Sequence, residues 1–477
     1  MTAHGTATVA AKMRLRSSTF SAAILFGLLQ GQFAMAFDRY PNSDWGRVDP
    51  EDAGWSRQKL EKAESWSRQI GSIAMMVVHH GVVVAEWGDT AAKTGLASVR
   101  KSLLSALIGN AVERKEIDLQ QTIESLGIDD NEPSLSAEEK TATVRDLLEA
   151  RSGVYHAALY ETHAAAAARP ARHSHKPGTF WHYNNWDFNT LGTIYERAAR
   201  SSIFDAFERE IARPTGMQDY QRTDGSYFTG AASVYPAYPF NMSARDLARF
   251  ALLYLNKGRW QDRQILPASW VQESTKAYSH SELGAGYGYL WWTGPLNNGV
   301  APSVNLPDGT FFAAGTGGQY AFVIPAYDLI VVHRGPHIEG GLANFRTVGR
   351  LLWLIFDAGK FPDIGPDASL EAAQGMRADG GALSRILTGK TLLYGDVVPG
   401  GPYRVRLNAD GTAAALRGKE PTEFDTGTWS IRENRFCREW KKIEPRQMCM
   451  TAVSAGSQIQ LFDSMGLMFI EARVVEE

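Results

Sequence analysis

Residues 98–109 read SVRKSLLSALIG, and their apolar positions recur every four residues, which predicts a helix continuing to residue 113. The helix begins with an SxxK motif, Ser98 and Lys101. In a helix this spacing places the lysine amine on the same face as the serine hydroxyl. A partly desolvated lysine has a lowered pKa and acts as a base, and the helix N-terminus favours an alkoxide. Taken singly, the motif fits an ordinary helix start with a solvated lysine better than it fits an active site.

A second polar motif, Tyr183-Asn184-Asn185, lies in the loop PGTFWHYNNWDFN of residues 177–189. Residues i and i+2 of an extended segment point the same way, so Tyr183 and Asn185 are expected to face one cleft. A phenol beside a lysine holds a proton in transit, and an amide orients both the lysine and a substrate carbonyl. The alternative is a core tyrosine followed by a turn-forming asparagine pair.

A third motif, Gly315-Thr316-Gly317-Gly318, separates two predicted strands in the stretch FFAAGTGGQYAFV of residues 311–323. Glycines at a strand edge leave backbone N–H groups that closely approach a substrate, as an oxyanion hole requires. A plain hairpin turn accounts for the same residues equally well.

Strand-like segments lie at both ends of residues 37–357. Residues 72–86 predict two strands folded at His80-Gly81, and residues 311–333 predict further strands with a turn at Pro325 to Asp328. An apolar-faced helix is expected over 342–356, and residues 140–260 are mostly helical with long loops. This order predicts an α+β domain, an αβα sandwich in which helices flank an antiparallel sheet and a helical insertion separates its strands.

In order and spacing, these motifs resemble the β-lactamase-like serine hydrolases: class C β-lactamases, D-Ala-D-Ala carboxypeptidases, related esterases and 6-aminohexanoate-dimer hydrolase. The resemblance covers residues 72–356. The stretches that carry it, besides the motifs, are AMMVVHHGVVVAEWG, SVRKSLLSALIG, VRDLLEARSGVYH, PGTFWHYNNWDFNTLG, NMSARDLARFALLYLNKGRW and GTGGQYAFVIPAYDLIVV.

The resemblance implies a role for each motif residue. Ser98 would be the nucleophile, Lys101 its base or proton carrier, Tyr183 a second acid or base, and Asn185 the orienting amide. The oxyanion would lie between the N–H of Ser98 and an N–H of the strand at Thr316, Gly317 and Gly318. Tyr155 and His156 fall where the family's substrate-lining loop begins. No metal ion or organic cofactor is implied.

The chain departs from the family at the head of the third motif. The family's β-lactamases and carboxypeptidases carry Lys or His there, whereas this chain has AAGTGG and no cation. That cation helps to bind a substrate carboxylate, so an uncharged ester or amide is the expected small-molecule substrate. Arg334 follows the last strand and is the candidate for a cation supplied from elsewhere.

The chain is too long, at 477 residues, for one ordinary core, and its formal net charge of −3 gives no basic surface for nucleic acid. Residues 1–36 have the pattern of an export leader: Arg14 and Arg16, an apolar run over 20–29, and Ala34-Met35-Ala36. The apolar run is shorter than the roughly 20 residues of a membrane span, and no later segment is long enough. A cleaved leader places the protein in the periplasm or outside the cell; a retained anchor or disordered leader is the alternative.

Residues 358–381 shift to Gly, Pro, Asp and Ala, as in a linker, and residues 382–477 predict a small all-β domain. This last part resembles lipocalin-like or otherwise barrel-like exported domains. Its two cysteines, Cys437 and Cys449, predict a disulfide in an exported protein, with two separate buried thiols as the alternative. They do not have the spacing of a zinc site.

These observations predict an exported serine hydrolase, of carboxylesterase or amidase type, that cleaves an ester or amide bond through an acyl-enzyme on Ser98. One alternative is a β-lactamase or D-Ala-D-Ala carboxypeptidase acting on cell-wall-type substrates. Another is a binding protein that kept the cleft without turnover. The pairs His79-His80 and His173/His175 have no third ligand at matching spacing and are read as surface or turn residues.

Overall fold

The structure is a computed structural model. It describes residues 39–281, 285–294, 304–336, 343–365, 369–394, 403–418, 421–442, 447–464, 466 and 468–476. The predicted leader, with Arg14, Arg16 and Ala34 to Ala36, lies outside the described residues.

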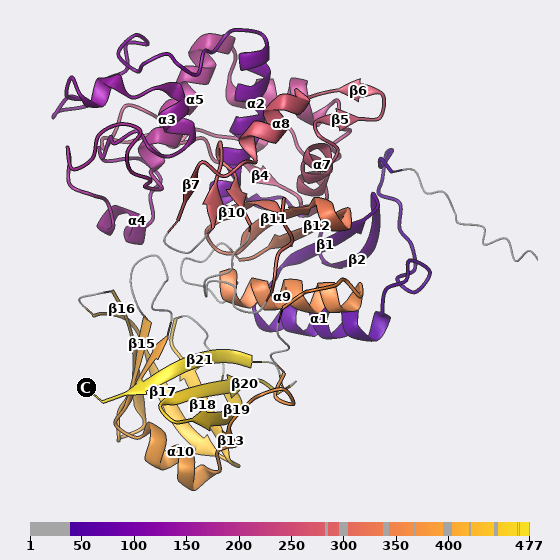
Figure 1. The fold of residues 1–477 in the computed structure, drawn as a ribbon, viewed down its shortest axis with the longest axis vertical. Coiled ribbons are helices and arrows are strands. Elements are labelled where there is room, and N and C mark those ends of the chain that lie inside the picture. The colour runs from indigo at the N-terminus through magenta and orange to yellow at the C-terminus, as the bar shows by residue number, and fades with distance from the viewer. Residues whose placement is uncertain are drawn as a thin grey trace, which may run out of the picture. The chain divides into compact units, whose positions relative to one another are not determined.

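Within the described residues, the first sheet has eight strands, all antiparallel, in the order β2-β1-β12-β11-β10-β9-β8-β7 (Figure 1). Its strands are β1 (Ala74–His79), β2 (Val82–Gly88), β7 (Ser279–His280), β8 (Gly286–Tyr287), β9 (Trp292–Thr293), β10 (Phe311–Gly315), β11 (Gln319–Ile324) and β12 (Leu329–Arg334). The predicted hairpins at His80-Gly81 and around the glycine-rich turn are confirmed. In the first, both turn residues have positive φ, 53° and 83°, so a glycine is favoured there.

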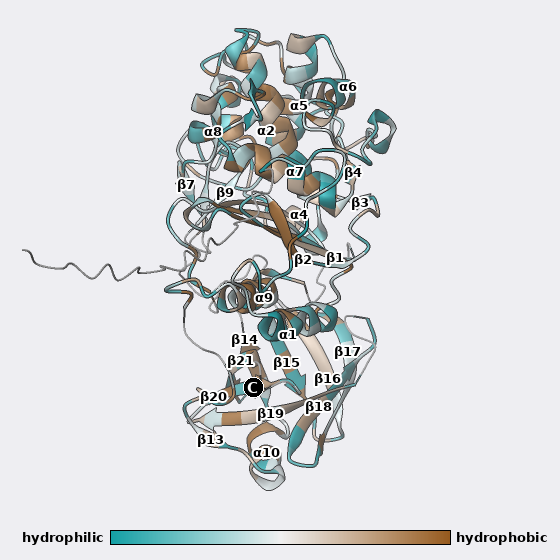
Figure 2. Ribbon diagram, turned by 90° about the vertical axis from the view of Figure 1, so that its right-hand side faces the viewer, coloured by the Kyte–Doolittle hydropathy of each residue, from teal (hydrophilic) through white to brown (hydrophobic). Residues whose placement is uncertain are grey.

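Helices cover both faces of this sheet because its central strands are apolar on both sides. Met76 and Val78 face a core formed with α2 (Arg100–Glu113), α5 (Asn185–Ala199) and α7 (Ala244–Leu255). Met75 and Val77 face a second core formed with α1 (Arg57–Gln69) and α9 (Phe345–Ala358). Figure 1 shows the two helical layers on opposite sides of the strands, and in Figure 2 hydrophobic stretches follow the strands and α2. The predicted αβα sandwich is confirmed.

The helical insertion runs between β2 and β10, also as predicted. Its remaining helices are α3 (Val144–Leu148), α4 (His163–Ala167), α6 (Ile203–Phe207) and α8 (Ala268–Ser274), with the 3₁₀ turns η1 (Ala97–Val99), η2 (Glu139–Thr141) and η4 (Arg222–Asp224) and the π-helical turn η3 (Glu208–Ala212). Its short strands outside the large sheet are β3 (Thr94–Gly95), β4 (Asn241–Met242), β5 (Arg259–Trp260) and β6 (Arg263–Gln264). Insertion and sheet meet at one place that matters for the site, where η1 and α2 begin beside the end of β10.

The C-terminal part is a barrel, which confirms the predicted all-β domain. Among the described residues, strands β14 to β21 form a ring because β19 pairs with β20 as well as with β18. Their bounds are β14 (Thr391–Tyr394), β15 (Tyr403–Leu407), β16 (Thr412–Arg417), β17 (Thr422–Arg432), β18 (Arg435–Trp440), β19 (Met448–Ala455), β20 (Gln458–Phe462) and β21 (Met468–Val475). Leu407, Met450, Ile459 and Leu461 are buried, as the alternation of apolar and polar residues requires.

Two short elements precede the ring. β13 (Met376–Arg377) pairs with β19, and α10 (Gly380–Leu387) follows it. Both begin inside the segment 358–381 that the sequence predicts as a linker.

A disulfide joins Cys437 on β18 to Cys449 on β19. The two residues face each other across the antiparallel pair. The predicted disulfide is therefore present in the structure.

Candidate active site

Ser98 lies in η1, two residues before Arg100, the first residue of α2. The residue before it, Ala97, has a φ of 48°, which a side-chain-bearing residue adopts only at a cost of about 1–3 kcal/mol. Val99 donates its N–H to the carbonyl of Leu96, closing the turn. This strained turn leaves the Ser98 side chain half-buried and accessible at the start of the helix.

Lys101 joins the two polar motifs predicted from the sequence. Its Nζ lies within hydrogen-bonding distance of three groups, 2.8 Å from Ser98 Oγ, 2.6 Å from Tyr183 OH and 2.8 Å from Asn185 Oδ1. The side chain is only 1% exposed, and Nζ lies 4.2 Å from the centre of the Tyr183 ring. One amine therefore contacts a candidate nucleophile, a phenol and an amide oxygen at once.

The second motif is held in place by the start of α5. Asn184 caps this helix by accepting from the N–H of Trp186, and Asn185 is its first residue. Asn185 Nδ2 donates to the carbonyl of Tyr160 at 2.6 Å, so its Oδ1 faces Lys101. The Tyr183 ring stacks on Trp292 of β9 at 5.5 Å. Both side chains are thus fixed by partners outside the motif.

Burial sets the protonation states at this site. It lowers the pKa of Lys101 well below its ordinary value of 10.5, since a buried ammonium loses its hydration. The charge of Arg100 lowers the same pKa further, while that of Glu161 raises it. Burial also raises the pKa of Tyr183 to about 12. Burial therefore favours the unprotonated form of the Lys101 amine, while the Tyr183 phenol keeps its proton at neutral pH.

The third motif forms the turn between β10 and β11, and Gly315 is the residue that approaches Ser98. A Cβ added to Gly315 would lie 2.9 Å from the Ser98 nitrogen and 2.6 Å from the Leu96 carbonyl oxygen. The N–H groups at a helix start have no intrahelical partner, so Ser98 N–H is available beside the end of β10. The Ser98 N–H is therefore one backbone donor of the kind that an oxyanion requires.

Thr316, Gly317 and Gly318 form the turn beyond this point. Gln319 Nε2 donates to the carbonyl of Gly317 at 3.0 Å, and His333 Nδ1 lies 2.7 Å from that of Gly318. Burial lowers the pKa of His333 to about 4, so the ring is neutral at physiological pH. Side chains of β11 and β12 therefore hold the turn through the carbonyls of Gly317 and Gly318.

Arg334 bonds to Gln319, one of the side chains that hold this turn. Its Nε donates to Gln319 Oε1 at 2.7 Å, its Nη1 to Met242 O at 2.6 Å and its Nη2 to Thr94 Oγ1 at 2.6 Å. The side chain is 1% exposed. These bonds commit the guanidinium to the protein, which corrects the expectation that Arg334 supplies a cation to substrate: the burial and bonding point to a structural role.

Tyr155 and His156 are also buried, with 3% and 6% exposure. The Tyr155 ring packs edge-on against His182, the neighbour of Tyr183. The two ring nitrogens of His156 lie 3.0 Å from the carbonyls of Ala157 and Asn131. No hydrogen bond or ring contact in the described part of the chain joins either residue to the Ser98 and Lys101 side chains, so substrate contact by Tyr155 and His156 stays a prediction.

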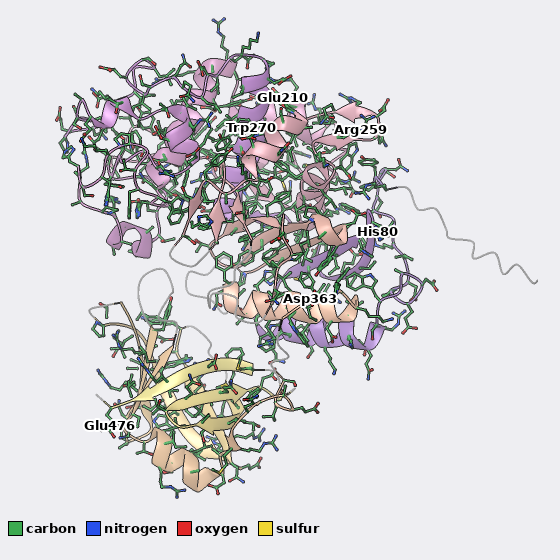
Figure 3. All side chains as sticks on the ribbon, in the orientation of Figure 1. His80, Glu210, Arg259, Trp270, Asp363 and Glu476 are labelled. Atoms are coloured by element: carbon green, nitrogen blue, oxygen red, sulfur yellow. A yellow bond between two sulfur atoms is a disulfide. The ribbon has the colours of Figure 1, made fainter. Side chains whose placement is uncertain are left out.

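The described hydrogen bonds and ring contacts of the histidine pairs do not involve Ser98, Lys101, Tyr183 or Asn185. His80 is at the turn between β1 and β2, where Figure 3 labels it, and its Nδ1 lies 2.7 Å from Asp328 Oδ2. His175 stacks on Phe180 at 3.9 Å. The described residues contain no group of three or more His, Cys, Asp or Glu side chains that would hold a metal ion.

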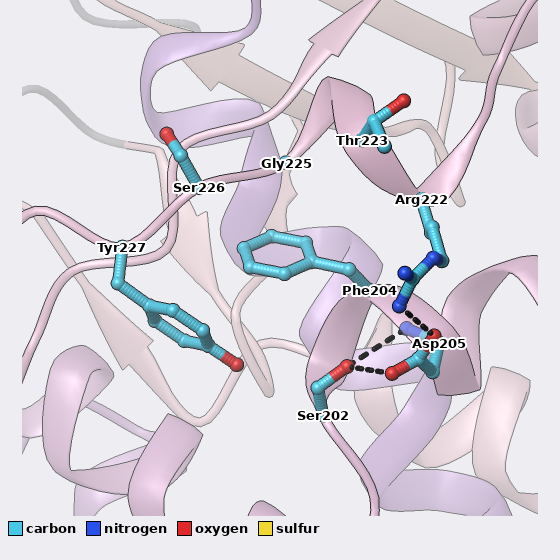
Figure 4. Close-up of a pocket in the computed structure, with 8 residues that line it drawn as sticks. All are labelled: Ser202, Phe204, Asp205, Arg222, Thr223, Gly225, Ser226 and Tyr227. Atoms are coloured by element: carbon cyan, nitrogen blue, oxygen red, sulfur yellow. Dashed lines mark hydrogen bonds and ion pairs between the residues drawn. The ribbon is translucent and has the colours of Figure 1, made fainter.

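A separate pocket of about 360 Å³ lies at α6 and η4 (Figure 4). Arg222 and Asp205 form an ion pair at 3.1 Å on one side of it, and the Phe204 ring lies between that pair and Tyr227. Its eight lining residues include none of the four residues at the Lys101 cluster; they are Ser202, Phe204, Asp205, Arg222, Thr223, Gly225, Ser226 and Tyr227.

Two features of the site could not be inferred from the sequence motifs. The left-handed conformation of Ala97 is invisible because alanine does not favour it. The role of Arg100 depends on which side chains surround it in space. Gly315, by contrast, is part of the third motif, and its lack of a side chain was the available signal for a close backbone approach.

Comparison with known proteins assigns the chain to a family. The family model described as Beta-lactamase matches residues 57–333. A search of curated proteins finds no match. No helix in the described residues has the length and apolar character to cross a membrane.

Solved structures with a similar fold include three from different organisms. A Bacillus anthracis protein described as a 6-aminohexanoate-dimer hydrolase is 21% identical, with a TM-score of 0.49, covering 68% of this chain and 90% of its own. A β-lactamase from Mycobacterium bovis is 21% identical, with a TM-score of 0.45, and the match covers 63% and 99%. An octameric penicillin-binding protein homologue from Pyrococcus abyssi is 15% identical, with a TM-score of 0.48, and the match covers 87% and 100%. Because the family model spans more than half of the chain, the protein belongs to the beta-lactamase family of serine hydrolases.

Proposed function

We propose that this protein is an exported hydrolase that cleaves an uncharged ester or amide through an acyl-enzyme on Ser98. The observation that carries the proposal is the position of the Lys101 amine, bonded at once to Ser98 Oγ, Tyr183 OH and Asn185 Oδ1. A buried lysine that contacts a serine hydroxyl and a phenol is equipped to move a proton between them.

In the first half of the reaction, Ser98 Oγ attacks the substrate carbonyl carbon and its proton passes to Lys101 Nζ. The carbonyl oxygen becomes an oxyanion facing the N–H of Ser98 and the backbone at Gly315. When the tetrahedral intermediate collapses, the bond to the leaving alcohol or amine breaks. The leaving group takes a proton through Tyr183 or Lys101, which leaves Ser98 acylated.

In the second half, water attacks the acyl-enzyme. The same amine and phenol accept a proton from the water and return one to Ser98 Oγ, so the site ends in its starting state. Asn185 contributes by holding the amine in line with both hydroxyls, since its own amide is fixed by the carbonyl of Tyr160.

The preference for an uncharged substrate rests on the charges at the end of β10. Residues 313–315 are Ala-Ala-Gly, and Arg334 is bonded to protein oxygens. A substrate carboxylate there would lose hydration without gaining a charged partner, a deficit of about 1.5–3 kcal/mol per missing charge-assisted bond. An uncharged acyl group has no such deficit and keeps the other interactions with the site.

Export is supported by the disulfide in the barrel, because disulfides persist in oxidising compartments. Sequencing the N-terminus of the mature protein tests it: cleavage after Ala36 is expected.

The deciding experiment compares kcat/KM for p-nitrophenyl butyrate and for nitrocefin, together with labelling of Ser98 by a fluorophosphonate. We expect labelling, and ester hydrolysis at least tenfold faster than nitrocefin turnover. Nitrocefin turnover equal to the ester's would favour the β-lactamase or carboxypeptidase alternative. Absence of both turnover and labelling would favour a binding protein.

A further inference from the structure

Arg100 is the first residue of α2 and lies between Ser98 and Lys101 in the chain. Its side chain is 0% exposed. One nitrogen, Nη2, donates to Asn189 Oδ1 at 3.3 Å, whereas Nε and Nη1 have no hydrogen-bond partner. No carboxylate in the described residues forms an ion pair with it. A guanidinium keeps its charge in a protein, so this is a buried and uncompensated positive charge.

Such a charge is costly, and two other buried arginines of this domain, Arg249 and Arg334, have several hydrogen-bond acceptors. Arg249 donates to the backbone carbonyls of Pro41, Thr215 and Asn42. Arg334 donates to Gln319, Met242 and Thr94. A buried charge without hydrogen bonds or a counter-ion destabilises a fold by several kcal/mol. Its position at Arg100, next to the reacting groups, points to a role in the chemistry.

The surroundings of Arg100 leave its field largely unopposed. Its guanidinium lies 4.4 Å from the Tyr238 ring centre and 5.6 Å from that of Tyr160. These neutral rings and the Asn189 amide shield the charge from water without cancelling it. On the other side, Lys101 Nζ contacts Ser98, Tyr183, Asn185 and the Phe188 ring, none of which is ionised at neutral pH. The carboxylate that acts on Lys101 is Glu161, and it is paired with Arg169.

We propose that Arg100 is a positioning residue of the active site, whose uncompensated buried charge keeps the Lys101 amine in its unprotonated, proton-accepting form. The inference rests on the proposed acyl transfer at Ser98. The charge of Arg100 also opposes the effect of burial on the pKa of Tyr183, so it favours proton acceptance at both members of the pair. Arg100 touches neither substrate nor Ser98 Oγ and acts through Lys101 and Tyr183.

The test measures the rate of Ser98 labelling by a fluorophosphonate between pH 5 and pH 10. In Arg100→Met we expect the rising limb of the profile to move to higher pH by roughly one unit. At a pH below the limb, the variant should label about tenfold more slowly than the native protein, and at a pH above the limb the two rates should be equal. Arg100→Lys keeps the charge, so its limb should stay near that of the native protein.

Substitutions at Asn189 test the same idea with Arg100 in place. Asn189→Asp puts a carboxylate beside the guanidinium and should move the limb upward as Arg100→Met does. Asn189→Ala removes the same amide without adding charge and should leave the limb unmoved. Each variant is compared at equal folded fraction, measured by near-ultraviolet circular dichroism.

Unchanged limbs in both Arg100→Met and Asn189→Asp would overturn the proposal while leaving the proposed function standing. An equal shift in Arg100→Lys, or in Asn189→Ala, would also overturn it, because packing instead of charge would then be the cause. If Arg100→Met does not fold, Asn189→Asp decides. Failure of the native protein to label at all would remove the proposed function and this inference with it.

Discussion

Ser98 in η1 is followed by further serines on the first turns of α2, and one of these provides a matched test of its role. Ser102, one turn further along, donates its hydroxyl to the carbonyl of Leu290 at 2.8 Å and is buried. We expect Ser98→Ala to lower kcat by roughly 10³ to 10⁶, as loss of a covalent nucleophile does. Ser102→Ala should cost stability, about 1 kcal/mol for the lost hydrogen bond, and keep most of the activity. Retention of more than about a tenth of kcat in Ser98→Ala would refute the assignment.

The protonation of Lys101 and Tyr183 predicts a pH dependence of defined sign. Only the unprotonated amine accepts the Ser98 proton, so kcat/KM is lost as pH falls through the pKa of Lys101. Since burial lowers that pKa from 10.5, the rising limb should lie well below pH 10. The phenol stays protonated up to about pH 12, so no falling limb is expected from Tyr183 before then. A pH series with p-nitrophenyl butyrate, corrected for spontaneous hydrolysis, measures both limbs; activity that appears only above pH 10 would contradict the reading of Lys101.

At the scale of elements, the approach of β10 to η1 depends on the absence of a side chain at Gly315. In Gly315→Ala the new methyl would meet the Leu96 oxygen at 2.6 Å, so strand and turn must separate. We expect kcat to fall by about a hundredfold or more, the cost of losing one oxyanion donor, with a small change in melting temperature. Gly381→Ala in α10 is the control, because its Cβ would have ordinary contacts of 3.4 Å and more. If the two variants were equally active, the close approach at Gly315 would have no part in catalysis.

Local pattern predicted the elements, and short motifs predicted the residues that meet at Lys101. The hairpin at His80-Gly81, the glycine-rich turn and the helix after Ser98 each follow from a few adjacent residues, which is why they were predictable. Arg334 shows the limit: its place after a strand gave no information on the acceptors at Met242 and Thr94, which come from distant parts of the chain. The strain at Ala97 depends likewise on packing across the whole domain.

At the scale of the whole molecule, the disulfide lies in the barrel, whereas Ser98, Lys101 and Tyr183 lie in the αβα domain. A cross-link closing a loop of this length, with a sequence separation of 12, stabilises by about 3 kcal/mol on the chain-entropy model. We expect the double variant Cys437→Ser, Cys449→Ser to unfold at lower denaturant concentration and to keep kcat/KM for the ester. Mass spectrometry without reductant should find no free thiol in the native protein, and two free thiols would refute the pairing.

The pairing of β1 with β12 also has a consequence for the order of events during synthesis. Ala74 pairs with Arg334, so the sheet that carries the site stays incomplete until its last strand has left the ribosome. At ordinary rates of translation, the residues between β2 and β10 take roughly 10 to 45 seconds to make. During that interval β1 lacks its partner strand β12. The turn that holds Ser98 likewise lacks β10, the strand beside which it lies in the folded domain. The proposed export would benefit from this delay, because the domain cannot complete its sheet before β12 has been made.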